Sequence, residues 1–444
     1  MGGAKPFTIP RGMVLDAYLK VKANGGAAGV DAVGMLEFDK NGKLNLYRIW
    51  NRMSSGSYMP PPVKLVEIPK KGGGVRPLGI PTISERIAQT VVAEQLGAQL
   101  DGLFHEDSYG YRPGKSAIEA LGRARTRCWK YGWVVDLDIR SFFDKLPHGL
   151  LMKAVRRHVD CKWVLLYVER WLKAPVQHPD GRIHARTKGV PQGSVLGPVL
   201  SNLFLHYAMD IWLTRNYPQC PFERFADDGI VHCRTMAEAT AVREALGRRL
   251  AECGLELHPE KTKVVYCRDS NRTQRQEAAI EFDFLGYTFM PRQAENRIRK
   301  VSFTNFLPAV SRKSMRSMRE KMDKRQTLKT AGCQIEDIAA EINPVVKGWI
   351  NYYGKFYKTK LKDFMRAINL RIVKWVRSKY LKVRPSVLKG LRWLKSISRK
   401  QPKLFAHWAY GALPTVGDNR SRMRRESHVR ICENFGAEMP GFTR

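Results

Sequence analysis

The sequence predicts an α+β protein in which a mixed front is followed by a basic, helical back. Residues 133–139 (Trp-Val-Val-Asp-Leu-Asp-Ile) end in the apolar and acidic alternation of a strand. Residues 194–212 repeat Val, Leu, Phe and Tyr at the spacing of a buried helical stripe. Residues 301–444 hold 32 Lys and Arg against only 10 Asp and Glu, which indicates a change of character near residue 290.

Further patterns in the first 290 residues predict another helix, additional strands and the turns between them. Residues 236–253 form an amphipathic pattern that stops at Gly254, as a helix would. Residues 224–233 predict a strand, a tight Asp-Asp-Gly turn and a second strand. A Gly- and Pro-punctuated turn is predicted at residues 187–193, and a strand pair at residues 282–289 that turns at Gly286.

The back predicts three helical stretches, at residues 311–329, 335–356 and 360–380. Aromatic residues interleave there with lysines, as in a surface that stacks on unpaired bases and binds phosphates. An ordinary helical core explains aromatic residues such as Trp349, Tyr353 and Trp375 equally well. The interleaved residues are Trp349, Tyr352, Tyr353, Phe356 and Tyr357 with Lys347, Lys355 and Lys358.

The charge of the chain points to a polyanionic partner. In its 444 residues, 77 Lys and Arg stand against 41 Asp and Glu, a net charge of +36. Such a protein binds phosphates strongly, because their neutralisation releases counterions. No membrane partner is expected, since no apolar run reaches the roughly 18 residues that span a bilayer. We therefore expect nucleic acid as the partner.

The amino terminus and the cysteines indicate a cytoplasmic protein. The first residues, Met-Gly-Gly-Ala-Lys-Pro-Phe, lack the apolar region of a secretory signal. No Cys-x-x-Cys pair occurs, which argues against a zinc module and a disulfide framework. A reduced compartment fits this usage. The eight cysteines are Cys128, Cys161, Cys220, Cys233, Cys253, Cys267, Cys333 and Cys432.

Asp138, Asp227 and Asp228 are candidate ligands of divalent cations. Joining nucleotides requires an activated 3′-oxygen and a neutralised pyrophosphate, and two cations some 4 Å apart can provide both. Mg²⁺, with Mn²⁺ as the alternative, needs only two or three carboxylates because it keeps several waters. Taken alone, Asp-Asp-Gly is also a common turn, and Asp136 with Asp138 also suits a solvated strand face.

The motifs around these aspartates resemble those of reverse transcriptases. Phe225-Ala-Asp-Asp228 resembles their (Phe/Tyr)-x-Asp-Asp box, and residues 138–144 resemble the carboxylate motif before it. The resemblance is strongest to the reverse transcriptase/maturases of bacterial group II introns and runs from about residue 25 to residue 408. Further matching blocks are residues 68–80, 108–114, 188–194 and 258–262 and, in the maturase region, residues 348–353 and 404–408.

This resemblance implies a right-hand polymerase fold. Fingers and a palm with an antiparallel sheet would precede an α-helical thumb that carries the maturase region. Asp138, Asp227 and Asp228 would hold two metal ions, with the backbone carbonyl of Ile139 as a further ligand. The spacing to the aromatic residue that follows favours Asp138 over Asp136.

The resemblance also implies which residues bind the incoming deoxynucleotide. Phe143, five residues after Asp138, would block a ribose 2′-hydroxyl, with plain core packing as the alternative. Solvated loop or strand-end positions remain the alternative for the basic residues. Arg76 would grip the triphosphate with help from Lys70 or Lys71, Gln192 and Gly193 would pack against nucleotide and template, and Lys261 would protonate the leaving pyrophosphate.

The expected function is RNA-directed addition of dNMPs to a primer 3′-end. The same protein would bind intron RNA for splicing and copy it into a DNA target, which is retrohoming. The alternatives are a non-catalytic RNA-binding splicing cofactor and a host-adopted reverse transcriptase in repair or defence. The expected domains are fingers and palm at residues 1–290, a helical thumb and maturase region at residues 291–410, and a basic tail at residues 411–444.

Some members of this family end in an endonuclease domain with paired cysteines. Only 36 residues follow Trp408, with Cys432 as their single cysteine. We therefore expect that domain to be absent. The basic residues 420–425 would touch DNA or form a disordered tail. Intron mobility would then need another primer, such as a nascent strand at a replication fork.

Overall fold

The computed structural model describes residues 5–69, 75–273, 278–296 and 301–416, which form two compact units. The first unit runs to Leu285 and includes Phe289–Leu307; the second contains Gly286–Thr288 and the chain from Pro308 onward. Each unit has its own hydrophobic core. The sequence prediction put one boundary at residue 290, whereas the chain passes between the units more than once. Lys70, Lys71, Cys432 and residues 420–425 lie outside the described residues.

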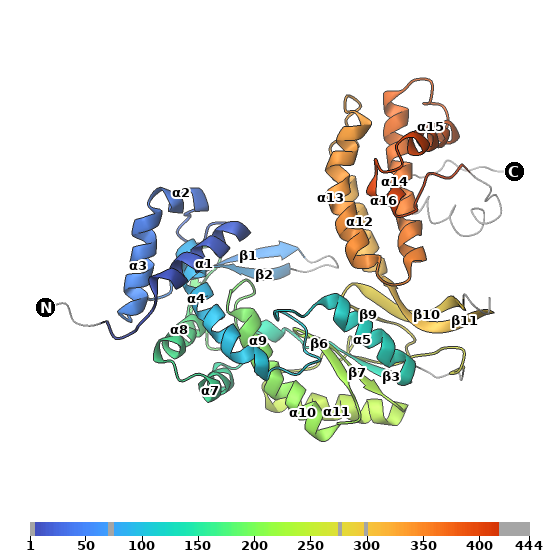
Figure 1. Cartoon of the computed structure of the whole chain (residues 1–444). Helices are drawn as coiled ribbons and strands as arrows, with labels where there is room; N and C mark the ends of the chain where they lie inside the picture. The colour runs from blue at the N-terminus through green and yellow to red at the C-terminus, as the bar shows by residue number, and fades with distance from the viewer. Residues whose placement is uncertain (1–4, 70–74, 274–277, 297–300, 417–444) are drawn as a thin grey trace. The chain divides into compact units, whose positions relative to one another are not determined.

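The first unit combines helices with two complete sheets and most of a third (Figure 1). Its helices are α1 (Arg11–Asn24), α2 (Met35–Lys40), α3 (Gly42–Ser54), α4 (Ile83–Leu100), the 3-10 turn η1 (Asp101–Leu103), α5 (Ala117–Lys130), α6 (Phe142–Lys145), α7 (His148–His158), α8 (Lys162–Lys173), α9 (Gly197–Leu205), the π-helical turn η2 (His206–Asp210), α10 (Ile211–Asn216) and α11 (Met236–Glu252).

The strands form sheets in the orders β2-β1-β4-β5, β6-β7-β3-β8 and β11-β10-β9. Antiparallel pairing joins all neighbours of the second sheet, as the sequence predicted for the palm. The strands are β1 (Val63–Pro69), β2 (Val75–Ile80), β3 (Trp133–Leu137), β4 (Val176–Gln177), β5 (Ile183–His184), β6 (Phe222–Phe225), β7 (Asp228–Cys233), β8 (Lys263–Tyr266), β9 (Phe282–Phe284), β10 (Tyr287–Asn296) and β11 (Val301–Val310).

Strand β3 is the inner strand that carries the first candidate carboxylates. Its β-branched Val134 and Val135 are fully buried and suit a strand that is covered on both faces. It pairs with β7 on one side and β8 on the other. Because side chains alternate along a strand, Asp136 and Asp138 point to the same face. The expected strand over residues 133–139 is therefore present, although its regular part ends at Leu137.

Helix α11 packs on this sheet through a regular apolar stripe. Its buried residues are Ala239, Val242, Leu246 and Leu250, at the three- and four-residue spacing of a helical face. The helix begins where the Thr235 hydroxyl accepts a hydrogen bond from the backbone N–H of Glu238. The predicted helix over residues 236–253 is thus confirmed and fixed to β3, β7 and β8.

The predicted turn in residues 224–233 was wrong by one position. Phe225 pairs with Asp228, so the turn consists of Ala226 and Asp227, and Asp228 already belongs to β7. Ala226 has a φ of 58°, a left-handed conformation that is costly for a residue with a side chain. The predicted Asp-Asp-Gly turn included Gly229, but Gly229 is an ordinary strand residue of β7.

The predicted helix over residues 194–212 begins later and is interrupted. Ser194 and Val195 stay in a turn because the Gln89 side-chain oxygen accepts hydrogen bonds from the Ser194 hydroxyl and the Val195 N–H, both at 3.0 Å. The regular helix α9 starts at Gly197, and the π-helical turn η2 follows it. Such turns bulge a helix locally and often occur at functional sites.

The second unit is helical, as predicted. Its apolar stripes include Met315, Met318 and Met322 of α12, which pack with the other helices into one core. Trp349 and Trp375 are buried in this core, so core packing rather than base stacking explains these two residues. The helices are α12 (Arg312–Asp323), α13 (Ile335–Tyr353), α14 (Lys358–Lys379), α15 (Val387–Lys400) and α16 (Ala406–Ala409).

The predicted helices of the back end earlier than expected. The first stretch stops at Asp323 rather than at residue 329, and the second stops at Tyr353. The strand pair near Gly286 is present, with Leu285 and Gly286 both at positive φ, as a two-residue hairpin requires. No helix in the described part of the chain is both long and apolar enough to cross a membrane.

Candidate functional site

The three predicted carboxylates come together at one end of the β6-β7-β3-β8 sheet. Leu137 pairs with Gly229, so the next step of the antiparallel register puts Asp138 across from Asp228. Asp227 is the neighbouring residue of the β6–β7 turn. Asp136, Asp138 and Asp228 line one open cavity together with Asp283. The structure thus brings together residues that are 90 positions apart in the sequence.

Burial and mutual repulsion raise the pKa values of these carboxyl groups. Burial, followed by the charges of Asp227 and Asp138, raises the pKa of Asp228 to about 7. Burial also raises the pKa of Asp227. Burial, followed by the charge of Asp228, raises the pKa of Asp136 to about 8. A bound cation would relieve this repulsion, because it favours the ionised carboxylates.

The donor set fits hard divalent cations. All candidate side-chain ligands here are carboxylate oxygens, the ligands that Mg²⁺ and Mn²⁺ prefer. Asp138, Asp227 and Asp228 do not form a group of the described residues in which one ligand atom from each lies within 4.8 Å of the other two. Their oxygens are therefore spread more widely than one ion needs. Carboxylates that share two ions are expected to stand further apart.

The buried Arg224 supports the turn that carries Asp227. Its guanidinium binds both oxygens of the buried Asp210 at 2.8 and 2.6 Å, at the end of the π-helical turn. It also donates to the Ala226 carbonyl oxygen at 2.9 Å, inside the turn itself. Two further acceptors complete the fork, the Asn202 side-chain oxygen at 2.9 Å and the Ser108 hydroxyl at 2.8 Å.

Sequence reasoning missed this role of Arg224. In the sequence Arg224 stands only at the start of an expected strand, although a charged residue inside a strand next to the Asp-Asp box is a usable signal. Gly110 adds to the same support, because a Cβ at this position would lie 2.3 Å from the Ala226 backbone nitrogen. The motif at residues 108–114 therefore packs against the turn and supports it.

Gln192 and Gly193 lie against strand β2. The Gly79 N–H donates to the Gln192 carbonyl oxygen at 2.7 Å. Gly193 has a φ of 113°, and a Cβ there would lie 2.3 Å from the Gly79 carbonyl oxygen. Only glycine fits this approach. The turn thus meets the strand that also carries Arg76, which is exposed and whose positive charge acts to lower the pKa of Asp227.

Phe143 lies in the short helix α6 directly after the first carboxylate motif. Its ring is half-buried and makes an edge contact with Phe142. Its carbonyl oxygen accepts a hydrogen bond from Val190 N–H at 2.7 Å, which ties α6 to the turn before α9. Ile139 pairs with Leu257 in an isolated β-bridge. Its hydrogen bonds are made by the neighbouring residues: the Arg140 N–H donates to the Glu256 carbonyl oxygen, and the His258 N–H donates to the Asp138 carbonyl oxygen.

Among the described residues that line the cavity, Lys261 forms an ion pair with Asp138. Its Nζ lies 3.7 Å from Asp138 Oδ2, an ion-pair distance that is too long for a hydrogen bond. The side chain is 61% exposed, so it retains the freedom to turn toward a bound ligand. Lys70 and Lys71, the other predicted lysines, lie outside the described residues.

A buried hydrogen-bonded chain behind the site ends at Glu85. Glu85 accepts from Tyr58 at 3.0 Å and from Gln89 at 3.2 Å, and Gln89 in turn holds Ser194 at the start of α9. Burial raises the pKa of Glu85 to about 7. Glu85 therefore keeps its proton in the folded chain at pH values where an unfolded chain has lost it.

Glu85→Gln is expected to remove a pH dependence of stability. The raised pKa stabilises the folded wild type fully below pH 4.5, and this contribution is lost as the pH rises to about 7. At pH 8 the variant should exceed the wild type by about 3 kcal/mol in free energy of unfolding, and the two should agree near pH 4. Urea unfolding from pH 4 to 8 measures this difference. Parallel curves over the whole range would show that Glu85 is ionised when folded.

Comparisons with known proteins agree with this geometry. Residues 68–289, half of the chain, match the family described as reverse transcriptase (RNA-dependent DNA polymerase). Residues 315–393 match the group II intron, maturase-specific domain. The first match contains the three aspartates, Arg76, Phe143 and Gln192, and the second lies within the helical unit.

Several curated proteins are similar to the chain. Protein YkfC of Escherichia coli is 30% identical over 303 residues, which cover 59% of this chain and 79% of that protein. The group II intron-encoded protein LtrA of Lactococcus lactis is 30% identical over 43% of this chain and 32% of its own length. The putative COX1/OXI3 intron 1 protein of Saccharomyces cerevisiae is 27% identical over 45% of this chain and 24% of its own. The chain thus spans most of the first relative but a third or less of the others.

A solved telomerase from Candida albicans, in complex with a fragment of telomeric RNA, is similar over 85% of this chain and 68% of its own. Its TM-score of 0.45 and identity of 14% are too low to support any argument about the site. The family match is direct, and reverse transcriptases generally use divalent metal ions and act on nucleic acids. The chain belongs to the reverse transcriptases and, through its second match, to the group II intron-encoded proteins that join a reverse transcriptase to a maturase domain.

Proposed function

We propose that the chain adds deoxynucleotides to a primer 3′-end, on an RNA template, at Asp138, Asp227 and Asp228. The observation that carries this proposal is the register of β3 on β7, which puts Asp138 across from Asp228 beside the turn that holds Asp227. These carboxylates and the Ile139 carbonyl would hold two divalent cations, Mg²⁺ or Mn²⁺. Bound there, the cations would supply charge neutralisation at the phosphates and a lowered pKa at the primer 3′-hydroxyl.

The basic residues around the cavity are proposed to bind the triphosphate. Arg76 is exposed on β2. Its positive charge acts to lower the pKa of Asp227, so Arg76 lies within electrostatic range of this carboxylate. Its planar fork suits two phosphate oxygens. Lys261, an ion-pair distance from Asp138, would give a proton to the departing pyrophosphate. Lys70 or Lys71 would add a further charge, a role that is proposed from the family resemblance.

The turn before α9 is proposed to position the nucleotide and the template base. Gly193 lets this turn approach the Gly79 carbonyl closely, and Gln89 fixes its far end at Ser194. Gln192 comes directly before Gly193, and its own carbonyl oxygen accepts a hydrogen bond from the Gly79 N–H. A turn that is held at both ends gives its side chains a defined direction, which favours precise positioning of a bound substrate.

Phe143→Ala is expected to relax the choice between deoxynucleotides and ribonucleotides. Phe143 stands five residues after Asp138. Its backbone carbonyl is hydrogen-bonded to Val190 and its ring packs against Phe142, so we expect the ring not to yield easily to a 2′-hydroxyl. Its removal should raise the relative efficiency of rNTP use on the order of 10²-fold. Single-nucleotide addition with each dNTP and rNTP measures the ratio. Retained discrimination with normal dNTP addition would mean that Phe143 only packs the core.

Primer extension on an RNA template tests the proposed reaction. With Mg²⁺ and dNTPs, the wild type should extend an annealed primer, and omission of the metal should stop extension. The cavity carboxylates motivate this expectation, because buried repelling charges suit a metal-binding site better than a stability role. A folded protein that binds RNA but extends no primer would instead support the non-catalytic splicing cofactor.

We further propose that the protein assists its own intron RNA. Residues 301–444 carry 32 Lys and Arg against 10 Asp and Glu, and this excess suits RNA phosphates. The protein would bind the intron for splicing in the bacterial cytoplasm and then copy it at a DNA target. Splicing of the adjacent intron with and without the protein tests the first step. A gene without flanking intron RNA would favour the host-adopted reverse transcriptase of repair or defence.

A further inference from the structure

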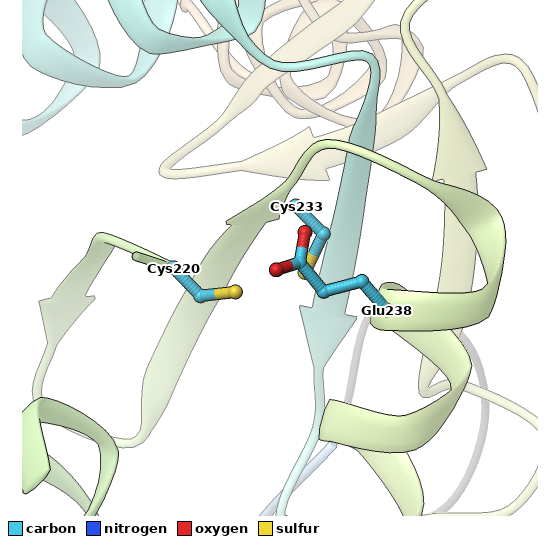
Figure 2. A group of neighbouring side chains, drawn as sticks. All are labelled: Cys220, Cys233 and Glu238. Atoms are coloured by element: carbon cyan, nitrogen blue, oxygen red, sulfur yellow. The ribbon is translucent and has the colours of Figure 1, made fainter. Parts of the chain in front are cut away.

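Two buried cysteines and a carboxylate lie together at the far end of the β6–β7 hairpin. Cys220 and Cys233 are 2% and 0% exposed, and Glu238 is partly exposed. One ligand atom from each lies within 4.8 Å of those of the other two. Figure 2 shows the two sulfur atoms and the carboxylate pointing toward one another from three different segments. This cluster lies wholly within the first unit.

The hairpin register explains why the two cysteines meet. Phe222 pairs with Val231, so the same register puts Cys220 directly across from Cys233. Phe225 and Asp228 form a hydrogen-bonded pair next to the turn, and alternation along the ladder makes the Cys220–Cys233 position a non-hydrogen-bonded one. Side chains at such positions approach most closely. The cysteines thus close the base of the hairpin whose tip carries Asp227.

Glu238 is held in place as the third member of the cluster. Its Oε2 accepts from the Arg234 N–H at 2.6 Å, and its Oε1 accepts from the Gln219 side-chain amide at 3.0 Å. Although burial opposes ionisation, these hydrogen bonds hold the pKa of Glu238 below its ordinary value. An ionised carboxylate that is oriented by neighbouring donors is what metal ligands commonly show.

We propose that Cys220, Cys233 and Glu238 form a binding site for one zinc ion. Two sulfurs and one oxygen suit zinc and exclude Mg²⁺, which prefers oxygen ligands alone. Because Glu238 is partly exposed, we expect a water to take the fourth position of a tetrahedral ion. The sequence argument against a zinc module relied on close Cys-x-x-Cys spacing, whereas strand pairing brings these cysteines together.

Binding requires the loss of two protons. In the metal-free chain, hydrogen bonding to Cys220 and burial raise the pKa of the Cys233 thiol, so Cys233 holds its proton there. As zinc forms one bond to each sulfur, each thiol gives its proton to solvent, and no electron is transferred. The bound ion would then join β7, the segment before β6 and the start of α11. It would stabilise the base of the catalytic hairpin.

The chain contains a matched control for this site. Cys128 and Cys267 also form a buried, hydrogen-bonded thiol pair in the first unit. Among the described residues, no carboxylate or histidine completes this second pair as Glu238 completes the first. Cys128→Ser should therefore leave zinc binding unchanged, whereas Cys220→Ser and Cys233→Ser should abolish it.

The test uses the full chain after reduction, removal of metals by chelation and addition of excess Mg²⁺ to occupy the aspartates. One equivalent of Co²⁺ should give a thiolate-to-cobalt charge-transfer band, and the band should disappear on addition of Zn²⁺. X-ray absorption of the zinc form should show two sulfur neighbours at about 2.3 Å. Zinc should also raise the Tm by a few degrees.

Surface variants keep the test valid if a buried serine prevents folding. Gln219→Ala removes only the exposed donor to Glu238, and it should weaken zinc binding about 10- to 100-fold. Glu252→Gln on the same helix is the control and should bind like the wild type. The proposal is overturned by zinc with oxygen and nitrogen neighbours only, by the absence of a cobalt band, or by isolation of Cys220 and Cys233 as a disulfide without zinc.

Discussion

Asp228→Asn is expected to lower the rate of dNMP addition by about 10³-fold or more, without loss of stability. The amide keeps the size of the side chain but cannot supply a charged oxygen to a divalent cation. In the metal-free protein the substitution also removes a carboxylate that burial and its neighbours Asp227 and Asp138 destabilise, as its pKa of about 7 indicates. At pH 8 and without Mg²⁺ the Tm should therefore rise, while activity is lost.

This combination separates a metal ligand from a structural residue. Glu260→Gln is the matched control, because Glu260 lines the same cavity and has no assigned role in metal binding. It should retain most of the wild-type rate. Single-turnover primer extension measures the rates, and thermal unfolding with and without Mg²⁺ measures the stabilities. A variant Asp228→Asn that polymerises normally would move the catalytic centre elsewhere, and a large fall in Tm would assign Asp228 a structural role.

The secondary structure around the candidate catalytic residues was predictable from the sequence, because it depends on short local motifs. The strand around Asp138, the hairpin around Asp227 and the helix of residues 236–253 each depend on neighbours in the sequence, and each was found close to its expected place. The helical character of the back followed from its spacing of apolar residues in the same way.

Features that depend on distant partners were not predictable. The turn shifted by one residue because Arg224 and Gly110 hold Ala226 in a left-handed conformation. Arg224 is itself held by Asp210 and Ser108, and these partners, like Gly110, lie outside the local sequence of the turn. The delayed start of α9 depends on Gln89, more than 100 residues away. The meeting of Cys220 and Cys233 requires the strand register. Long-range hydrogen bonds and register decided each of these differences.

Arg224→Met is expected to destabilise the first unit by about 3–5 kcal/mol, because it leaves the buried Asp210 without its partner. The double variant Arg224→Met/Asp210→Leu removes both charges and should recover most of that loss, since an apolar pair can replace a buried ion pair. Chemical denaturation of the two variants beside the wild type measures these differences. Equal stability of the single and double variants would mean that Asp210 does not depend on Arg224.

The double variant also tests whether Arg224 positions the catalytic turn. It lacks the hydrogen bond to the Ala226 carbonyl oxygen, so the left-handed turn that carries Asp227 loses its internal support even when stability returns. A displacement of about 1 Å in a reacting group can cost on the order of 10²-fold in rate. We therefore expect kcat to fall by this factor, while the KM for dNTP stays close to wild type because Arg76 and the turn at Gln192 are unchanged. A stable double variant with normal kcat would show that the turn keeps its geometry without the arginine.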